Sequence, residues 1–188
     1  MSTAILPPST RVPPPVAPFV AAGGGPRPSV AQTGVWIAIG TISMSFAALT
    51  SALVVRQSGA SDWQHFQLPP LLYLNTLVLL ASSITLEWSR RRQAPAGLHA
   101  TLVLGLLFIA GQVLAWRQLG AQGLFLATGP SSAFFYVFTV LHALHVLGGL
   151  GGLVYVQRRP AALGPAALYW HFMAALWLYL LALLTIRG

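Results

Sequence analysis

The sequence contains no cysteine, no lysine and very few acidic residues. Without cysteine the chain has no disulfide bond, no thiolate metal ligand and no cysteine nucleophile. Asp62 and Glu87 are its only acids, and 6% of its 188 residues are charged, whereas ordinary soluble domains have about 25%. Hydrophobic residues make up 56% of the chain. These proportions predict an integral membrane protein.

The positive charge of the chain comes from ten arginines, which give a formal net charge of +8 at pH 7. A strongly basic protein can bind nucleic acid, but these arginines occur singly or in short groups beside apolar segments. We therefore expect a membrane surface as their partner and no nucleic acid. In the segment "EWSRRR", Arg90 and Arg91 follow Glu87 by three and four residues and can pair with it, while Arg90, Arg91 and Arg92 can also hold lipid phosphates.

Residues 1–32 differ in composition from the rest of the chain. Eight of the fourteen prolines and a glycine triplet occur within residues 1–30, without helical or alternating periodicity. This composition predicts a disordered or polyproline-like arm. The arm also lacks the continuous apolar stretch of a secretory signal, so we expect it to stay in the cytoplasm.

Residues 33–188 contain five apolar segments, and about 20 apolar helical residues suffice to cross a hydrocarbon core of ~30 Å. The connections are rich in Gly, Pro, Ser and Arg, and they are short, so neighbouring helices should be antiparallel. The sequence predicts an all-α integral membrane protein, a five-transmembrane-helix bundle preceded by the Pro-rich arm. The predicted spans are about 33–55, 69–88, 98–118, 131–157 and 166–186.

The orientation of the bundle follows from the arginines on alternate sides of the membrane, because arginine is enriched in cytoplasmic loops. Three lie on one side, Arg56, Arg117 and Arg187, and the other seven lie on the opposite side. This count predicts a cytoplasmic N-terminus. Trp88 and Trp170 would then anchor the cytoplasmic interface, where an amphipathic indole prefers to lie.

Few polar residues occur inside the spans, and none of those near the middle is acidic. Ion-coupled transporters usually need an ionisable group there, and many show inverted repeats or broken helices. The sequence shows neither feature, so a transporter is disfavoured. We expect Asn75, Gly148 and Gly152 to serve helix packing, since the segment "GGLGG" has the spacing of small residues that allows a close approach of a helix or an acyl chain.

His142 and His145 are spaced three residues apart and share one helix face. One hypothesis is a metal or haem site completed by His171, as in a membrane enzyme or haem carrier. At 1.5 Å rise per residue, however, His171 lies about 10 Å closer to the cytoplasmic surface than His145. The favoured interpretation is that the imidazoles are neutral and hydrogen-bond between helices, with His171 able to contact a lipid headgroup.

Four segments together resemble subunit III of the haem-copper cytochrome oxidases. They are "GVWIAIGTISMSFAALTSALVVRQ", "LNTLVLLASSITLEWSRRR", "LHALHVLGGLGGLVY" and "YWHFMAALWLYLLALL", in the family's order and spacing. The resemblance covers nearly everything from residue 33 onward and is to the shorter, five-helix bacterial form. It implies the cytoplasmic (inner) membrane of a bacterium as the location.

The resemblance further implies an accessory, redox-silent subunit of an aerobic cytochrome c oxidase, which reduces oxygen to water and translocates protons. This chain would bind no haem or copper, which would reside in partner subunits, namely the catalytic subunit I and subunit II. Phospholipids would bind in a cleft of the subunit. The alternative is the related component of a quinol oxidase or of nitric oxide reductase, and no residue of this chain distinguishes the two.

Two residues depart from the family pattern. Ile42 stands where members usually have a glutamate, in a pattern like "SEAMFFAAL", and Ala174 stands where they favour an acid after "YWHF". A role in proton uptake that depends on these carboxylates is therefore disfavoured. The departures favour a scaffold or lipid-holding role.

Overall fold

Five long helices form almost all of the described structure, a computed structural model that describes residues 29–59 and 68–187. Each helix is long and apolar enough to cross a membrane. The predicted all-α fold with five spans is thus confirmed, whereas nearly all of the predicted arm lies outside the described residues. The helices are α1 (Val30–Ser58), α2 (Leu71–Arg92), α3 (Pro95–Ala121), α4 (Pro130–Arg158) and α5 (Leu163–Arg187), with a short 3-10 helix, η1 (Pro160–Ala162), before α5.

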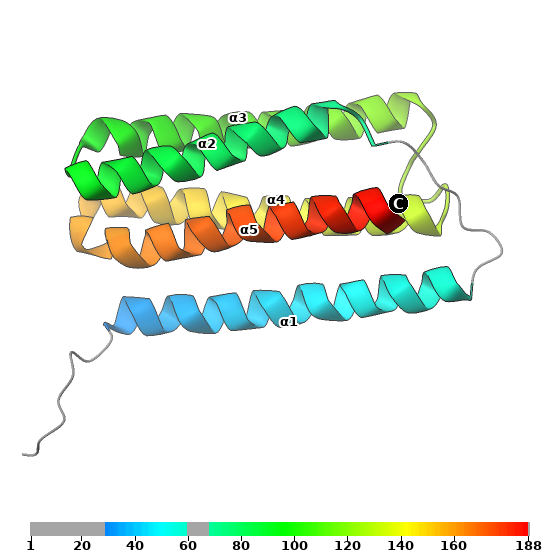
Figure 1. Ribbon diagram of the computed structural model, residues 1–188, viewed down its shortest axis with the longest axis horizontal. Coiled ribbons are helices and arrows are strands. Elements are labelled where there is room, and N and C mark those ends of the chain that lie inside the picture. The colour runs from blue at the N-terminus through cyan, green and yellow to red at the C-terminus, as the bar shows by residue number, and fades with distance from the viewer. Residues whose placement is uncertain (1–28, 60–67, 188) are drawn as a thin grey trace, which may run out of the picture.

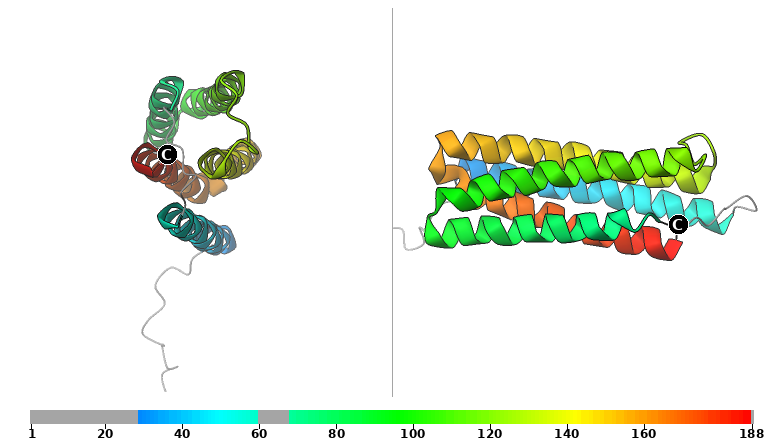
Figure 2. Two further views of the ribbon diagram at one scale, coloured as in Figure 1. Left: turned by 90° about the vertical axis from the view of Figure 1, so that its right-hand side faces the viewer. Right: turned by 90° about the horizontal axis from the view of Figure 1, so that it is seen from above.

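The helices are arranged in three layers (Figure 1). The antiparallel pair α2 and α3 forms the first layer, the pair α4 and α5 the second, and α1 the third. Since α2 packs on α3 and α5, and α4 packs on the same two helices, α2 to α5 close into a ring. The end-on view shows α1 outside this ring, along the side formed by α4 and α5 (Figure 2).

The helices extend beyond the apolar segments from which they were predicted. α1 begins at Val30 rather than at about residue 33, because the Ser29 hydroxyl caps its N-terminus by accepting a hydrogen bond from the Gln32 amide at 3.2 Å. α3 begins at Pro95, a residue type that suits the first turn of a helix. Residues 30–32 therefore belong to a helix and not to the arm.

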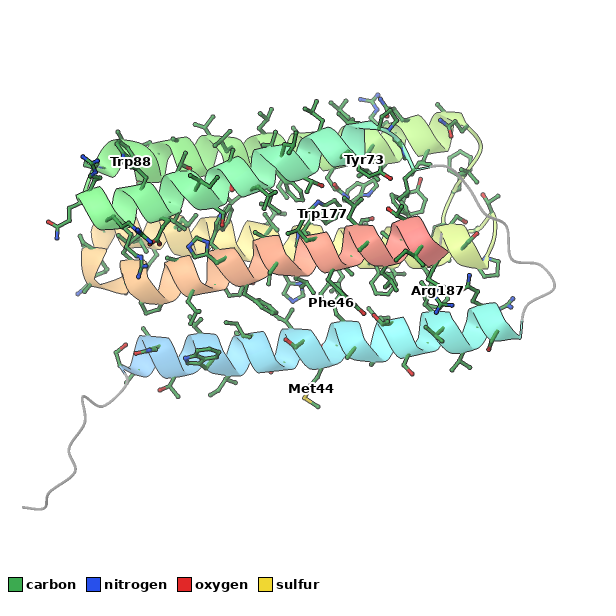
Figure 3. All side chains as sticks on the ribbon, in the orientation of Figure 1. Met44, Phe46, Tyr73, Trp88, Trp177 and Arg187 are labelled. Atoms are coloured by element: carbon green, nitrogen blue, oxygen red, sulfur yellow. The ribbon has the colours of Figure 1, made fainter. Side chains whose placement is uncertain are left out.

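The outer surface of the bundle is apolar, and its large buried side chains lie between the helices. Phe46 of α1 points toward α4 and α5 and is 1% exposed, whereas Met44 points away and is 76% exposed (Figure 3). Every long helix likewise has a buried side and an exposed side, and exposed Leu, Val and Ile side chains cover the outside of the bundle. Such a surface suits contact with lipid or with other membrane subunits.

Candidate functional site

A pair of side-chain amides joins α2 to α3 in the middle of the ring. Asn75 Nδ2 donates to the Phe108 carbonyl at 2.9 Å and to Gln112 Oε1 at 3.1 Å. Both side chains are buried. Gly111 permits this arrangement, because a Cβ atom at that position would overlap the Asn75 amide. Asn75 therefore hydrogen-bonds α2 to α3 through Phe108 and Gln112.

Three tryptophans donate their indole N–H groups to hydroxyls on neighbouring helices. Two of the bonds join α5 to α2 and the third joins α3 to α4, and Thr76, Ser82 and Thr139 are all buried. A buried indole N–H usually finds such a partner, and these bonds fix how the helices pack. The bonds are Trp177 to Thr76 at 2.8 Å, Trp170 to Ser82 at 3.0 Å and Trp116 to Thr139 at 3.0 Å.

Trp170 does not face the membrane interface, so that prediction is wrong. Its side chain is 1% exposed and lies inside the ring. Gly105 and Gly149 make room for the indole, since a Cβ atom at Gly105 would lie 2.9 Å from it and one at Gly149 would lie 3.2 Å from it. Trp88, in contrast, is 48% exposed and lies near the end of α2 that leads into α3 (Figure 3).

The packing glycines also differ from those expected. A Cβ atom at Gly148 or Gly152 would meet nothing within 4 Å, so no helix approaches closely there. Both are exposed and line an open apolar groove of about 470 Å³ between α1 and the α4–α5 pair. The glycine of this segment that does contact another helix is Gly149, against Tyr169 and Trp170.

His142 and His145 do not hydrogen-bond between helices through their rings, contrary to prediction. The His145 ring pairs with the Leu141 carbonyl of its own helix at 2.7 Å. The His142 ring is fully buried beside Phe108 and Trp177, with ring centroids 5.9 Å and 5.1 Å apart. Across residues 29–59 and 68–187, no group of three His, Cys, Asp or Glu side chains could hold a metal ion.

His171 is separate from these two histidines and contacts α2. Its Nδ1 lies 2.6 Å from the Ser83 hydroxyl, and its Nε2 lies 3.6 Å from a Glu87 carboxylate oxygen. The same carboxylate accepts hydrogen bonds from Arg90 at 2.9 Å and from Arg91 at 2.7 Å. His171 thus connects α5 to a charged cluster at the end of α2.

We call this end of the bundle the arginine-rich end, defined by Arg90, Arg91, Arg92, Arg158 and Arg159. All five are exposed, and Glu87 is the one acid among the described residues. The turn between α2 and α3 and the turn between α4 and α5 both lie here (Figure 1). This end therefore carries a net positive charge at the level where the spans leave the apolar layer.

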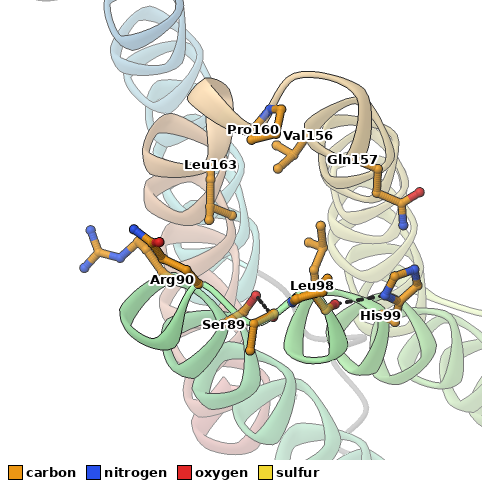
Figure 4. A pocket seen from close by; sticks show the side chains of 11 residues that line it. Ser89, Arg90, Leu98, His99, Val156, Gln157, Pro160 and Leu163 are labelled. Carbon is orange, nitrogen blue, oxygen red and sulfur yellow. Dashed lines mark hydrogen bonds between the residues drawn. The ribbon is translucent and has the colours of Figure 1, made fainter.

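A pocket of about 640 Å³ opens at the arginine-rich end between the two helical turns (Figure 4). Its lining includes the apolar side chains of Leu98, Val156 and Leu163. Arg90 lies at its edge and turns its guanidinium group away from the pocket (Figure 4), where it pairs with Glu87 at 2.9 Å, and the His99 ring pairs with the Pro95 carbonyl at 2.9 Å. An apolar lining beside exposed arginines matches an amphipathic ligand with a negatively charged head.

The family model for cytochrome c oxidase subunit III matches residues 42–188 of the chain. The chain belongs to the cytochrome c oxidase subunit III family. The subunit 3 protein of Thermostichus vulcanus is 27% identical over 181 residues, which cover 85% of this chain and 89% of that protein.

Two further subunit 3 proteins are similar to parts of the chain. That of Latimeria chalumnae is 31% identical over 140 residues, 65% of this chain and 51% of the relative. That of Struthio camelus is 32% identical over 124 residues, 57% of this chain and 46% of the relative. The chain therefore spans about half the length of these two members of the subunit III family.

The two residues that depart from the subunit III pattern both lie inside the bundle. Ile42 on α1 is 6% exposed and Ala174 on α5 is 4% exposed, and both belong to the apolar core. Apolar side chains need no hydrogen-bond partner there, whereas a buried carboxylate would need one. These positions of the chain thus contribute packing rather than an ionisable group.

Proposed function

We propose that the chain is an accessory, redox-silent subunit III of a haem-copper cytochrome c oxidase in a bacterial cytoplasmic membrane. The oxidase would reduce oxygen to water and translocate protons, with haems and copper held by catalytic subunit I and by subunit II. The family match over residues 42–188 is the observation that carries this proposal. The relatives share the printed name cytochrome c oxidase subunit 3, which favours this function over a role with a quinol oxidase or nitric oxide reductase.

The contacts within the bundle support a structural role for this subunit. The Asn75–Gln112 pair and the tryptophan–hydroxyl bonds use buried polar groups to hold helices together. Ile42 and Ala174 place buried apolar side chains at the two positions where the family pattern has an acid. The subunit would therefore act through its packing against subunit I.

Deleting the chain tests this role in the assembled oxidase. Oxygen uptake by the remaining subunits should begin at a rate close to that of the complete enzyme and decline after fewer turnovers. Adding back the purified subunit should restore the longer activity. If the oxidase without this subunit lost its haem or copper, or had no initial activity, the chain would be part of the redox machinery and the proposal would be wrong.

We further propose that a phospholipid with an anionic headgroup occupies the pocket at the arginine-rich end. The exposed arginines beside the pocket would hold the phosphate, and the apolar lining, which includes Leu98, Val156 and Leu163, would contact the upper part of the acyl chains. The exposed arginines at this end add long-range attraction for negative charge.

Native mass spectrometry of the complete oxidase tests the lipid proposal. Leu163→Trp fills the pocket and should reduce the number of phosphatidylglycerol or cardiolipin molecules retained after detergent washing. Leu106→Trp is the control, because Leu106 is 58% exposed on α3 and does not line the pocket. Equal lipid retention by both variants would contradict the proposal without affecting the assignment of the chain as subunit III.

A further inference from the structure

Two side chains in the ring of α2 to α5 are fully buried and keep nitrogen atoms without a hydrogen-bond partner. Gln112 and His142 are both 0% exposed. Within the described part of the chain, no group pairs with Gln112 Nε2 or with either ring nitrogen of His142. Buried polar atoms are nearly always paired, either with protein groups or with ordered water. These nitrogens therefore indicate a partner other than the side chains of residues 29–59 and 68–187.

The orientation of the two amides is fixed by the Phe108 carbonyl, which can only accept a hydrogen bond. Asn75 must therefore turn its Nδ2 toward Phe108, at 2.9 Å, and the same nitrogen lies 3.1 Å from Gln112 Oε1. Reversing the Gln112 amide would bring two donor groups together, and reversing Asn75 would bring two oxygens together. Gln112 Nε2 is thus directed away from Asn75 and offers its hydrogens to a different acceptor.

Contacts on both sides of Gln112 place it at the level of His142. Phe108, Gln112 and Trp116 are spaced four residues apart, so they follow one side of α3. The Phe108 ring lies 5.9 Å from the His142 ring, and Trp116 Nε1 donates to Thr139 at 3.0 Å. Phe108 and Trp116 therefore both contact α4. The residues that they contact there, His142 and Thr139, are three positions apart. Gln112 lies between these two contacts.

We propose that the core holds ordered water here, hydrogen-bonded to Gln112 Nε2 and to a ring nitrogen of His142. Water can accept from the amide and donate to a neutral imidazole, which an apolar guest cannot do. A metal ion does not fit, because an amide N–H group is a donor and no acid lies nearby on the described helices. This inference rests only on contacts within the chain and is independent of its function in an oxidase.

A cryo-EM map of the assembled complex tests the inference directly. At a resolution where other buried waters are visible, we expect density within about 3.2 Å of both Gln112 Nε2 and a His142 ring nitrogen. A map without such density would overturn the proposal. A direct hydrogen bond between the two side chains would overturn it as well.

Variants of the two histidines on α4 provide a matched comparison in the same complex. His142→Phe removes the acceptor, and the water density should be lost. His145→Phe is the control, because the His145 ring pairs with its own helix at 2.7 Å, and the density should remain. Density that persists in His142→Phe would contradict the role of His142. If that variant fails to assemble, Gln112→Met replaces it, and the map of the unaltered complex decides in any case.

Discussion

At the scale of single residues, glycines determine how closely the helices approach. Gly111 faces the Asn75 amide, whereas Gly148 faces open space. The two glycines therefore have different functions although both lie within long helices. Only the first allows a buried hydrogen-bonded pair to form across two helices.

We expect Gly111→Ala to lower the free energy of unfolding of the subunit by about 2 kcal/mol. The added methyl group would displace Asn75 from the Phe108 carbonyl and from Gln112, leaving buried polar groups without partners. Thermal unfolding of the purified complex in mild detergent measures the change.

Gly148→Ala is the control for this substitution, because a Cβ atom there meets nothing within 4 Å. Its stability should be unchanged or slightly higher, since alanine favours a helix over glycine by up to about 1 kcal/mol. An equal loss of stability in both variants would show that the overlap with Asn75 is not the cause.

The contacts of residues within the spans could not be predicted from the sequence. The amide partner of Asn75 was not foreseen, and Trp170 was expected at the interface but is buried. A tryptophan near the end of a span can face lipid or the bundle, and the choice depends on space supplied by other helices. Here Gly105 and Gly149 supply that space. Both are far from Trp170 in the sequence, so the contact could not be predicted from it.

At the scale of helices, α1 differs from the other four because it contacts the bundle on one side only. It packs against α4 and α5, mainly through Ile42, Phe46 and Leu53. The Phe46 ring lies 6.2 Å from Phe138 and 6.0 Å from the His145 ring. Tyr179 adds a hydrogen bond to Thr50 at 2.9 Å. The attachment of α1 therefore depends on a few side chains.

Phe46→Ala should weaken this attachment by about 3 kcal/mol, because it removes a fully buried aromatic ring. Hydrogen exchange measured by mass spectrometry should become faster in α1 and remain unchanged in α2 and α3. Met44→Ala is the control, since that side chain is 76% exposed and points away from the bundle. Faster exchange throughout the ring would contradict the view that α1 is held separately.

Hydropathy predicted the number and approximate position of the helices, but not their ends. α2 was expected to stop at about residue 88 and continues to Arg92. Arg90 and Arg91 lie one turn beyond Glu87 and pair with it, so the charged residues remain helical after the apolar stretch ends. The spacing of these charged residues is visible in the sequence, but charged residues lower the mean hydropathy from which the end of the span was predicted.

At the scale of the whole molecule, the distribution of arginines predicts how the bundle lies in the membrane. Because the chain contains no cysteine, single cysteines can report its orientation. Gln122→Cys, beyond α3, should react with a membrane-impermeant maleimide in intact spheroplasts. Gln157→Cys, at the arginine-rich end, should react only after the membrane is opened. Labelling with the opposite pattern would reverse the predicted orientation.

The family could be predicted from four motifs in order, whereas the electron donor could not. Residues that bind cytochrome c or a quinol, and those that hold haem and copper, would lie on partner subunits. The buried groups described here, such as the Asn75–Gln112 pair, hold this subunit together and do not report on those partners.

We propose that the chain is a redox-silent subunit of a haem-copper cytochrome c oxidase, so it should purify with the haem-bearing subunits and carry no haem itself. Purifying the affinity-tagged chain from its native membrane in mild detergent, with a reduced-minus-oxidised spectrum and mass spectrometry of what accompanies it, tests this claim most directly. We predict a complex that contains haem, copper and a large catalytic partner, and a colourless chain once it is separated. Stoichiometric haem on the separated chain, or purification of the chain alone, would contradict the claim.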